Sequence, residues 1–268
     1  MSVRKIIGIV LVKNEDLYID YILNNIRDFC DEIIVADNLS SDQTATRIRA
    51  VQEEIPSISY HSIRRTSKSH DLIKKYCGDN VWIFAVDGDE LYDPDGLTKL
   101  RKAIMQGDYD NCWMIFGNVL NCVEVDFKEK IAKGFLAPPC RSMTKLYNFA
   151  AIDDWSGYCS ERLHGGEITF RVGFSQSDRL YMYKDVQWQD SCFRCLHLCF
   201  IPRSSNEQDC SGDLVIRKNI ADRLSESLLT RFLSWGKQFM GVEQKSSWKR
   251  EKYMRGELVM KDISSFLS

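Results

Sequence analysis

A group of carboxylates stands directly after the apolar run WIFAV. Asp87, Asp89 and Glu90 come first, and Asp93 and Asp95 lie close behind. Carboxylates this close repel one another, so water, basic side chains or a metal cation must compensate them. An Asp-x-Asp pair alone is weak evidence, because such pairs are common in solvated loops. Its chemical interpretation is a site for a divalent cation.

Polar residues also follow two earlier apolar runs. The run IIGIVLV leads into Asn14 and Glu15, and the run EIIVAD ends at Asp37. Continuous aliphatic runs of this kind are typical of strands buried on both faces of a parallel sheet. The carboxyl ends of parallel strands meet at one edge, where α/β proteins bind ligands. We therefore expect these polar residues to lie near Asp87 and Asp89.

The elements that must position these residues alternate along the first half of the chain. Strand-like runs occupy residues 6–12, 32–38, 57–63 and 81–87, with helical spacing between them, and Pro94 can open the next helix. This βαβαβαβ order predicts an α/β fold with a Rossmann-like, mostly parallel sheet.

The second half has a less regular pattern. NCWMIFGNVL, from Asn111, predicts one strand, and short strands continue to about residue 202. Helical spacing begins at Asp213, and a second helix is expected from about Ser247 to Phe266.

Composition narrows the class of protein. The chain has 268 residues, 44% of them hydrophobic and 28% charged, with a net charge of −2, which gives no reason to expect a general nucleic-acid binder. No run approaches the roughly 20 apolar residues of a transmembrane helix. The apolar run near the N-terminus is short and resembles a buried strand more than a signal peptide. We therefore expect a cytoplasmic protein whose ten cysteines are reduced.

Three blocks together resemble the family 2-like glycosyltransferases of the GT-A fold. GIVLVKNED is similar to their first strand, IIVADNLSSDQT to their VVDDGSTDGT turn, and WIFAVDGDELYDP to their Asp-x-Asp motif. The blocks keep the family's order and spacing over roughly the first 110 residues. One departure is Asn38 with Leu39, where the family usually has Asp-Gly, and it bears on recognition of the base.

The resemblance implies a nucleotide-sugar donor, a UDP- or GDP-sugar, and a Mn²⁺ or Mg²⁺ ion held by Asp87 and Asp89. Such a cation neutralises the diphosphate as it leaves. Asp37 would accept a hydrogen bond from the base, and Glu15 would face the nucleoside. Arg64 and Lys68 could reach the diphosphate, although a solvated basic loop explains them equally well. The expected donor-binding residues are Val12, Asn14, Glu15, Asp37, Arg64, Lys68, Asp87 and Gly88.

A transfer that inverts the sugar's configuration, as we expect here, needs a general base, usually a carboxylate. The stretch GYCSE resembles the Gly-x-Val-His-Glu segment of one family branch, with Ser160 in place of the His, which favours Glu161 as the base and Asp154 as the next candidate. A retaining enzyme would need neither.

His197 lies in LHLCFIPRS, which resembles a family strand whose His can face the donor metal, so we take it as a third metal-facing residue. A core histidine is the alternative. A zinc site built from Cys192, Cys195, His197 and Cys199 is disfavoured, because a structural zinc usually needs a second pair of ligands elsewhere.

We expect a GT-A catalytic domain at residues 1–210 and a helical C-terminal extension at 211–268. Within the first, residues 1–110 would bind the nucleotide sugar and 111–210 the acceptor, a saccharide, a lipid-linked group or another hydroxyl compound. The basic and aromatic stretch KSSWKREKYMRGE could place the extension on an anionic surface, although a solvated helix face is the simpler interpretation.

The sequence thus predicts a metal-dependent glycosyltransferase. A nucleotidyltransferase is an alternative, but the Gly-rich basic loop that it would need after the first strand is missing from VLVKNEDLY. A non-catalytic protein that binds nucleotide sugars is the other alternative, against which Asp87 and Asp89 argue.

Overall fold

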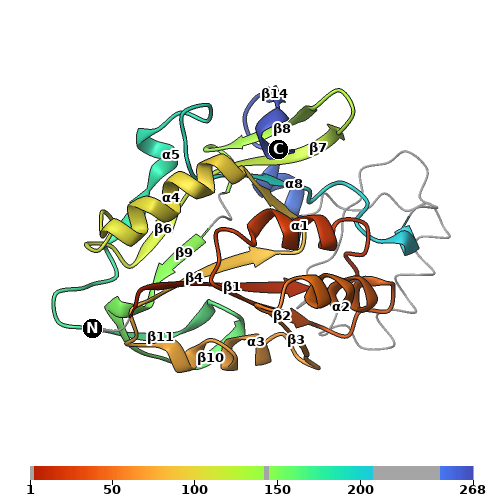
Figure 1. The fold of residues 1–268 in the computed structure, drawn as a ribbon. Helices are drawn as coiled ribbons and strands as arrows, with labels where there is room; N and C mark the ends of the chain where they lie inside the picture. The colour runs from red at the N-terminus through yellow and green to blue at the C-terminus, as the bar shows by residue number, and fades with distance from the viewer. Residues whose placement is uncertain (1–2, 142–144, 208–247, 268) are drawn as a thin grey trace.

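The computed structural model describes residues 3–141, 145–207 and 248–267. A seven-stranded sheet crosses the centre of the molecule in the order β12-β6-β9-β4-β1-β2-β3 (Figure 1). Its strands are β1 (Lys5–Val12), β2 (Glu32–Asp37), β3 (Ile58–Ser62), β4 (Val81–Asp87), β6 (Met114–Phe116), β9 (Lys145–Asn148) and β12 (Arg179–Tyr181).

Strands β4, β1, β2 and β3 run parallel, as the alternating pattern predicts. In their register Leu11 of β1 faces Asp87 of β4, and Val12 faces Asp37 of β2. The carboxyl ends of three strands therefore meet at one edge, which confirms the α/β fold and the expected meeting of the polar strand ends.

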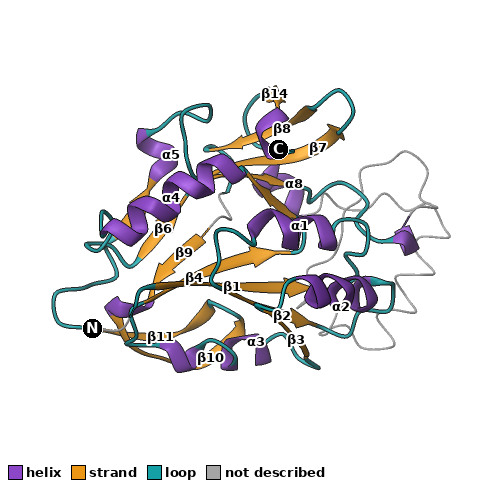
Figure 2. Cartoon of the chain, in the orientation of Figure 1, coloured by secondary structure: helices purple, strands orange, loops and turns teal. Residues whose placement is uncertain are grey.

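The sheet is covered on both faces (Figure 2). Strand β1 supplies both cores by simple alternation, with Ile6 and Val10 on one side and Ile7 and Ile9 on the other. Three helices cover the first side, and short helices with a β-hairpin cover the second. The first group is α1 (Ile19–Ile26), α2 (Thr44–Glu54) and α4 (Pro94–Gln106); the second is α3 (Lys68–Asp71), η1 (Lys74–Tyr76), η2 (Phe149–Ala151), β10 (Ile152–Glu161) and β11 (His164–Phe170).

A second sheet lies beyond α1 and α4 in the order β14-β8-β7-β13-β5 (Figure 1). Leu91, Leu120 and Leu196 from three of its strands pack with Phe266 in a separate small core. The remaining elements are β5 (Glu90–Tyr92), β7 (Asn118–Asp126), β8 (Ile131–Ala137), β13 (Arg194–His197), β14 (Leu258–Asp262), α5 (Met182–Asp185), η3 (Ser205–Glu207), α8 (Trp248–Tyr253) and η4 (Ser264–Phe266).

The expected single strand NCWMIFGNVL is two strands in two sheets. Gly117 separates β6 from β7, and a Cβ on this residue would lie 2.1 Å from the carbonyl oxygen of Phe193. The chain passes so close to its neighbour that no side chain fits there. Periodicity alone cannot reveal such a junction, because the apolar pattern is the same on both sides of it.

The expected helix from Ser247 to Phe266 is wrong over most of its length. Helix α8 ends at Tyr253, and Gly256 then adopts the left-handed φ of +88°. The following β14 pairs antiparallel with β8, so the edge of the second sheet satisfies its backbone groups. This part of the expected helical extension therefore belongs to the body of the protein. The other expected helix, around residues 224–235, lies outside the described residues.

Among the described helices, none combines the length and apolar character that a membrane crossing requires.

Candidate active site

The acids of the Asp-x-Asp motif lie at the end of β4, in contact with the residues that end β1. Gly88 is the point of closest approach, because a Cβ there would lie 2.8 Å from Cγ of Glu15 and 3.0 Å from Cγ1 of Val12. Only glycine fits between the two aspartates without displacing these side chains. The structure therefore brings Val12, Glu15, Asp87 and Gly88 together, as the sequence predicts.

Asp87 is paired with Arg162, a residue that sequence reasoning missed. The Arg162 guanidinium donates through Nη2 to Oδ1 of Asp87 and through Nη1 to the carbonyl oxygen of Val86, at 2.9 Å in the second case. Burial alone would raise the pKa of Asp87, but the charges of Arg162 and then His197 lower it below its ordinary value. Asp87 is therefore an anion in this arrangement.

Helix α3 and the hairpin fix the backbone of Arg162. Its N–H donates to Oγ of Ser69 at 2.7 Å, and its carbonyl oxygen lies 2.6 Å from Nδ1 of His70. Arg162 itself has φ of +26°, in the left-handed region where a side chain costs energy, so its placement depends on these contacts. Ser69 and His70 of this helix thus position the cation beside Asp87.

Asp89 and Glu15 share Arg203, the second cation that the sequence did not indicate. Nη1 of Arg203 donates to Oδ2 of Asp89, and its Nε lies 3.5 Å from Oε2 of Glu15. All three residues are at most 7% exposed. The backbone of Arg203 is held by the N–H of Leu17, and Ser205 donates to Asp16 in the loop after β1. This segment therefore closes over the acids at the end of β1.

Glu90 and His197 complete the acidic end of β4. They face each other in the antiparallel pair β5-β13, and Nε2 of His197 lies 3.5 Å from Oδ2 of Asp89. Burial alone would lower the pKa of His197, but Cys199 and Glu90 raise it to about 10. Nδ1 of His197 lies 2.8 Å from Oδ1 of Asn121. His197 thus lies beside Asp89 as a counter-charge, and its expected contact with a metal stays a prediction.

Binding of a divalent cation by the acids stays a prediction that their chemistry allows. No three His, Cys, Asp or Glu side chains in the described part of the chain are placed to hold a metal together. Mg²⁺ and similar ions, however, often take only one or two carboxylates and complete their shell with water and substrate phosphates. Asp87 and Asp89 provide such oxygens, and buried Oε1 of Glu90 beside them has no hydrogen-bond partner.

Asp37 is engaged within the protein. Its Oδ1 accepts from the Ser40 N–H at 3.0 Å and hydroxyl at 2.6 Å, and its Oδ2 accepts from the Tyr60 hydroxyl at 2.7 Å. Leu39 follows with φ of +52°, at the position where the family usually has glycine. A side chain in this left-handed conformation costs backbone energy, so the departure noted in the sequence is not free of strain.

The expected basic loop does not contact the acids. Arg64 is exposed, and Lys68 pairs with Asp71 at 2.8 Å on the surface of α3. Asn14 has φ of +57° and bonds through its side chain to the Ser41 N–H at 2.8 Å, so it ties the β1 end to the β2 end.

The two candidate bases have different surroundings. Asp154 is half exposed and lies 3.3 Å from Nζ of Lys74, away from the Asp-x-Asp acids. Oε1 of Glu161 lies 2.8 Å from Nδ1 of His164 across the end of the hairpin. The two acids stand seven residues apart on β10, roughly 20 Å along a regular strand. The geometry thus favours Glu161 over Asp154, but with a histidine in contact.

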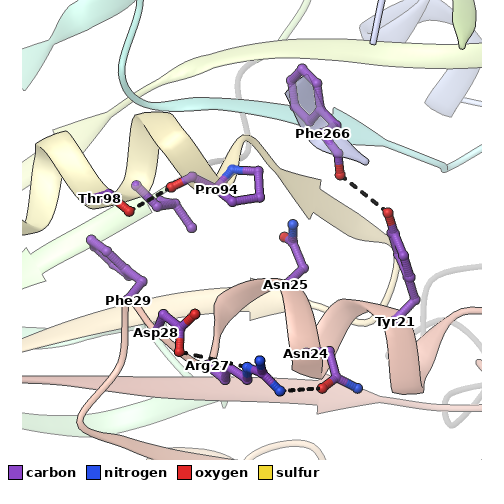
Figure 3. A pocket seen from close by; sticks show the side chains of 10 residues that line it. Tyr21, Asn24, Asn25, Arg27, Asp28, Phe29, Pro94, Thr98 and Phe266 are labelled. Carbon is purple, nitrogen blue, oxygen red and sulfur yellow. Dashed lines mark hydrogen bonds and ion pairs between the residues drawn. The ribbon is translucent and has the colours of Figure 1, made fainter. Parts of the chain in front are cut away.

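A separate pocket of about 260 Å³ lies between α1 and α4 and is closed by Phe266 (Figure 3). The Asp-x-Asp acids do not line it. Its Asn25 bonds both backbone groups of Tyr92, and the Tyr21 hydroxyl donates to the Phe266 carbonyl oxygen. These polar groups are occupied in holding the second sheet to α1.

More than half of the chain matches one family model. The family model described as glycosyl transferase family 2 matches residues 9–160, more than half of the chain. The chain belongs to glycosyl transferase family 2. The family resemblance expected from the three sequence blocks is therefore confirmed.

Curated relatives match a shorter segment. The SPbeta prophage-derived glycosyltransferase SunS of Bacillus subtilis (strain 168) is 31% identical over 94 residues, which are 35% of this chain and 22% of SunS. The chain spans about a fifth of the length of this relative. Glycosyltransferase SunS of Bacillus phage SPbeta matches to the same extent.

Similarity to solved structures is weaker than the family match. Mannosyltransferase PcManGT from Pyrobaculum calidifontis, in complex with GDP-Man and Mn²⁺, is 19% identical, with a TM-score of 0.34 over 47% of this chain and 37% of its own. Glucosyl-3-phosphoglycerate synthase from Mycobacterium tuberculosis is 15% identical, with a TM-score of 0.37 over 56% of this chain and 58% of its own.

Proposed function

We propose that this family 2 chain is a metal-dependent glycosyltransferase that moves a sugar from a nucleotide donor to an acceptor hydroxyl with inversion. The observation that carries the proposal is the meeting of Glu15, Asp87 and Asp89 around Gly88 at the carboxyl edge of a parallel sheet. Buried acids of this number are costly to maintain unless they serve a ligand or a partner charge.

Asp87 and Asp89 would hold Mn²⁺ or Mg²⁺, which neutralises the charge of the departing diphosphate when it is bound. Glu15 and Asp37, at the ends of β1 and β2, would face the nucleoside. Arg162 and Arg203 already balance the acids by contact. They would hold the carboxylates in fixed positions before the donor arrives, so that little reorganisation is needed when it binds.

Donor binding can be tested by thermal unfolding with UDP, GDP, CDP and dTDP, each with and without Mn²⁺. A nucleotide at about 100 times its Kd should stabilise the fold by about 2.7 kcal/mol. For a chain of this size that corresponds to a rise of about 5–10 °C in Tm. We expect one nucleotide to give this rise only when Mn²⁺ is present.

Two variants localise the effect. Asp89→Asn keeps the side chain's shape and removes its charge, and should abolish the metal-dependent rise. Asp95→Asn removes an exposed charge from the first turn of α4 and should preserve it. Absence of a rise for every nucleotide, or the same rise in Asp89→Asn, would refute the proposal. Release of sugar from the bound nucleotide sugar then separates an enzyme from a non-catalytic binding protein.

A further inference from the structure

Three titratable side chains form a connected row beside Asp87. Nζ of Lys145 lies 2.7 Å from Nε2 of His164, and Nδ1 of His164 lies 2.8 Å from Oε1 of Glu161. Their positions follow from strand pairing: Lys145 of β9 is opposite Ala85 of β4, and Glu161 is opposite His164 in the hairpin. Ala85 and Asp87 share one face of β4, so the row begins next to the Asp-x-Asp acids.

The chemistry of the row is set at its carboxylate end. Burial alone would raise the pKa of Glu161, but His164 and Arg162 lower it below its ordinary value, so Glu161 is an anion. With the proton of its ring on Nδ1, next to the Glu161 carboxylate, His164 presents Nε2 to Lys145. Nε2 of His164 then carries a lone pair and accepts an N–H from Lys145. The lone pair of an uncharged Lys145 amine is directed away from His164.

The surroundings of Lys145 favour the uncharged amine. Burial lowers the pKa of Lys145 to about 8, Arg162 acts in the same direction, and Asp87 opposes both. Arg141 also lowers this pKa, and Glu90 raises it. Lysines whose pKa is lowered towards neutrality in this way can accept a proton.

A small cavity adjoins the amine. Its volume is about 10 Å³, close to the space that one water molecule requires. Asp87, Lys145, Arg162 and His164 are among the residues that line it. One water molecule, the acceptor in a hydrolysis reaction, therefore has room beside the amine and Asp87.

We propose that Lys145 is the general base of the transfer reaction, positioned by His164 and Glu161. The inference rests on the function proposed above. The acceptor oxygen forms a bond to the anomeric carbon as its proton passes to Nζ of Lys145. The bond between the anomeric carbon and the diphosphate oxygen breaks, and the nucleoside diphosphate leaves with the electron pair. Glu161 is thus a positioning residue rather than the base that the sequence suggested.

Lys145→Arg tests this role, because arginine keeps a positive charge but cannot act as a base at neutral pH. The probes are UDP-glucose and GDP-mannose with Mn²⁺, whose hydrolysis uses water as the acceptor. We expect kcat of Lys145→Arg to fall about 10²- to 10⁴-fold, while the stabilisation by nucleoside diphosphate persists. The matched control is Lys133→Arg, on the surface of β8 with Glu124 at 2.7 Å, and its kcat should not change.

The pH profile provides a second, independent measurement. The rate of the wild-type protein should rise with pH through about 8, as Lys145 loses its proton. In Glu161→Gln this rise should move to lower pH, because removing the anion destabilises the ammonium form of Lys145 through His164. A residue that only supports the fold would lower the rate without moving the profile.

The outcomes separate this inference from the proposed function. Full hydrolysis by Lys145→Arg, or a wild-type rate that is flat between about pH 6.5 and 9.5, would overturn the role of Lys145 while nucleotide binding still supports a glycosyltransferase. Failure of the wild-type protein to bind any nucleotide would overturn the proposed function, and the base with it.

Discussion

Replacement of Arg203 by methionine should destabilise the protein strongly, because two buried acids depend on this side chain. Arg203 contacts Asp89 and lies 3.5 Å from Glu15, and the two acids are 4% and 5% exposed. Methionine keeps much of the aliphatic volume and removes the charge. Breaking a buried ion pair from one side costs about 3–5 kcal/mol, since the remaining charge is left without compensation.

The expected loss lies near the lower end of this range. His197 remains 3.5 Å from Asp89 and still compensates part of its charge. We therefore expect a decrease of about 3 kcal/mol in the free energy of unfolding. This corresponds to a decrease of about 6–12 °C in Tm for a protein of this size.

The assay is urea denaturation at pH 7, with Arg47→Met as the matched control. Arg47 lies 3.0 Å from Asp20, but both side chains are at least 40% exposed. An exposed pair of this kind contributes at most about 1 kcal/mol. Adding Asp89→Asn to Arg203→Met should recover part of the loss, because the unpaired charge disappears. Saturating Mn²⁺ should also stabilise Arg203→Met more than the wild type.

Equal losses in Arg203→Met and Arg47→Met would refute the reasoning. So would strict additivity of Arg203→Met and Asp89→Asn, since residues in direct contact should show a coupling energy. Either result would mean that the acids at the end of β4 are compensated by solvent rather than by this arginine.

Two further predictions concern the framework. Gly117→Ala should lower the free energy of unfolding by at least about 1–3 kcal/mol, because its Cβ would overlap the Phe193 carbonyl oxygen; an unchanged urea midpoint would contradict the close approach of the two segments. The second prediction concerns Asp31, which pairs with Arg101 at 2.6 Å. Burial alone would raise the pKa of Asp31, but hydrogen bonds from Arg101 and from the Ile6 N–H lower it below its ordinary value. A lowered folded-state pKa stabilises the protein above the unfolded-state value of about 3.9 and ceases to do so as pH falls through the folded-state value. The stability difference between wild type and Asp31→Asn should therefore be largest at pH 7 and shrink at pH 3 in urea titrations, and a constant difference would exclude the linkage.

The sequence alone determined the framework and the positions of the acids along it. The apolar runs that end at Val12, Asp37 and Asp87 are continuous, so each predicts a buried strand without knowledge of its partners. Their alternation with helical segments fixes a parallel arrangement, and parallel strands bring their carboxyl ends to one edge. Local sequence patterns are enough to predict these strands and helices, because each element has its own hydrophobic pattern.

The tertiary structure decided which cation compensates each acid. Arg162 is 75 residues from Asp87 in the chain, and Arg203 is 114 residues from Asp89. Contacts between residues so far apart produce no periodic pattern in the sequence. The chain has 36 lysines and arginines, and the sequence does not indicate which of them pairs with a given acid. The contact of Glu161 with His164 likewise depends on the register of the hairpin. Residues Leu258–Asp262 are a strand, β14, because their backbone groups pair with the edge strand β8. Such pairings depend on how distant segments pack against one another. Charge and hydrophobic patterns along the chain describe each segment alone and do not show this packing.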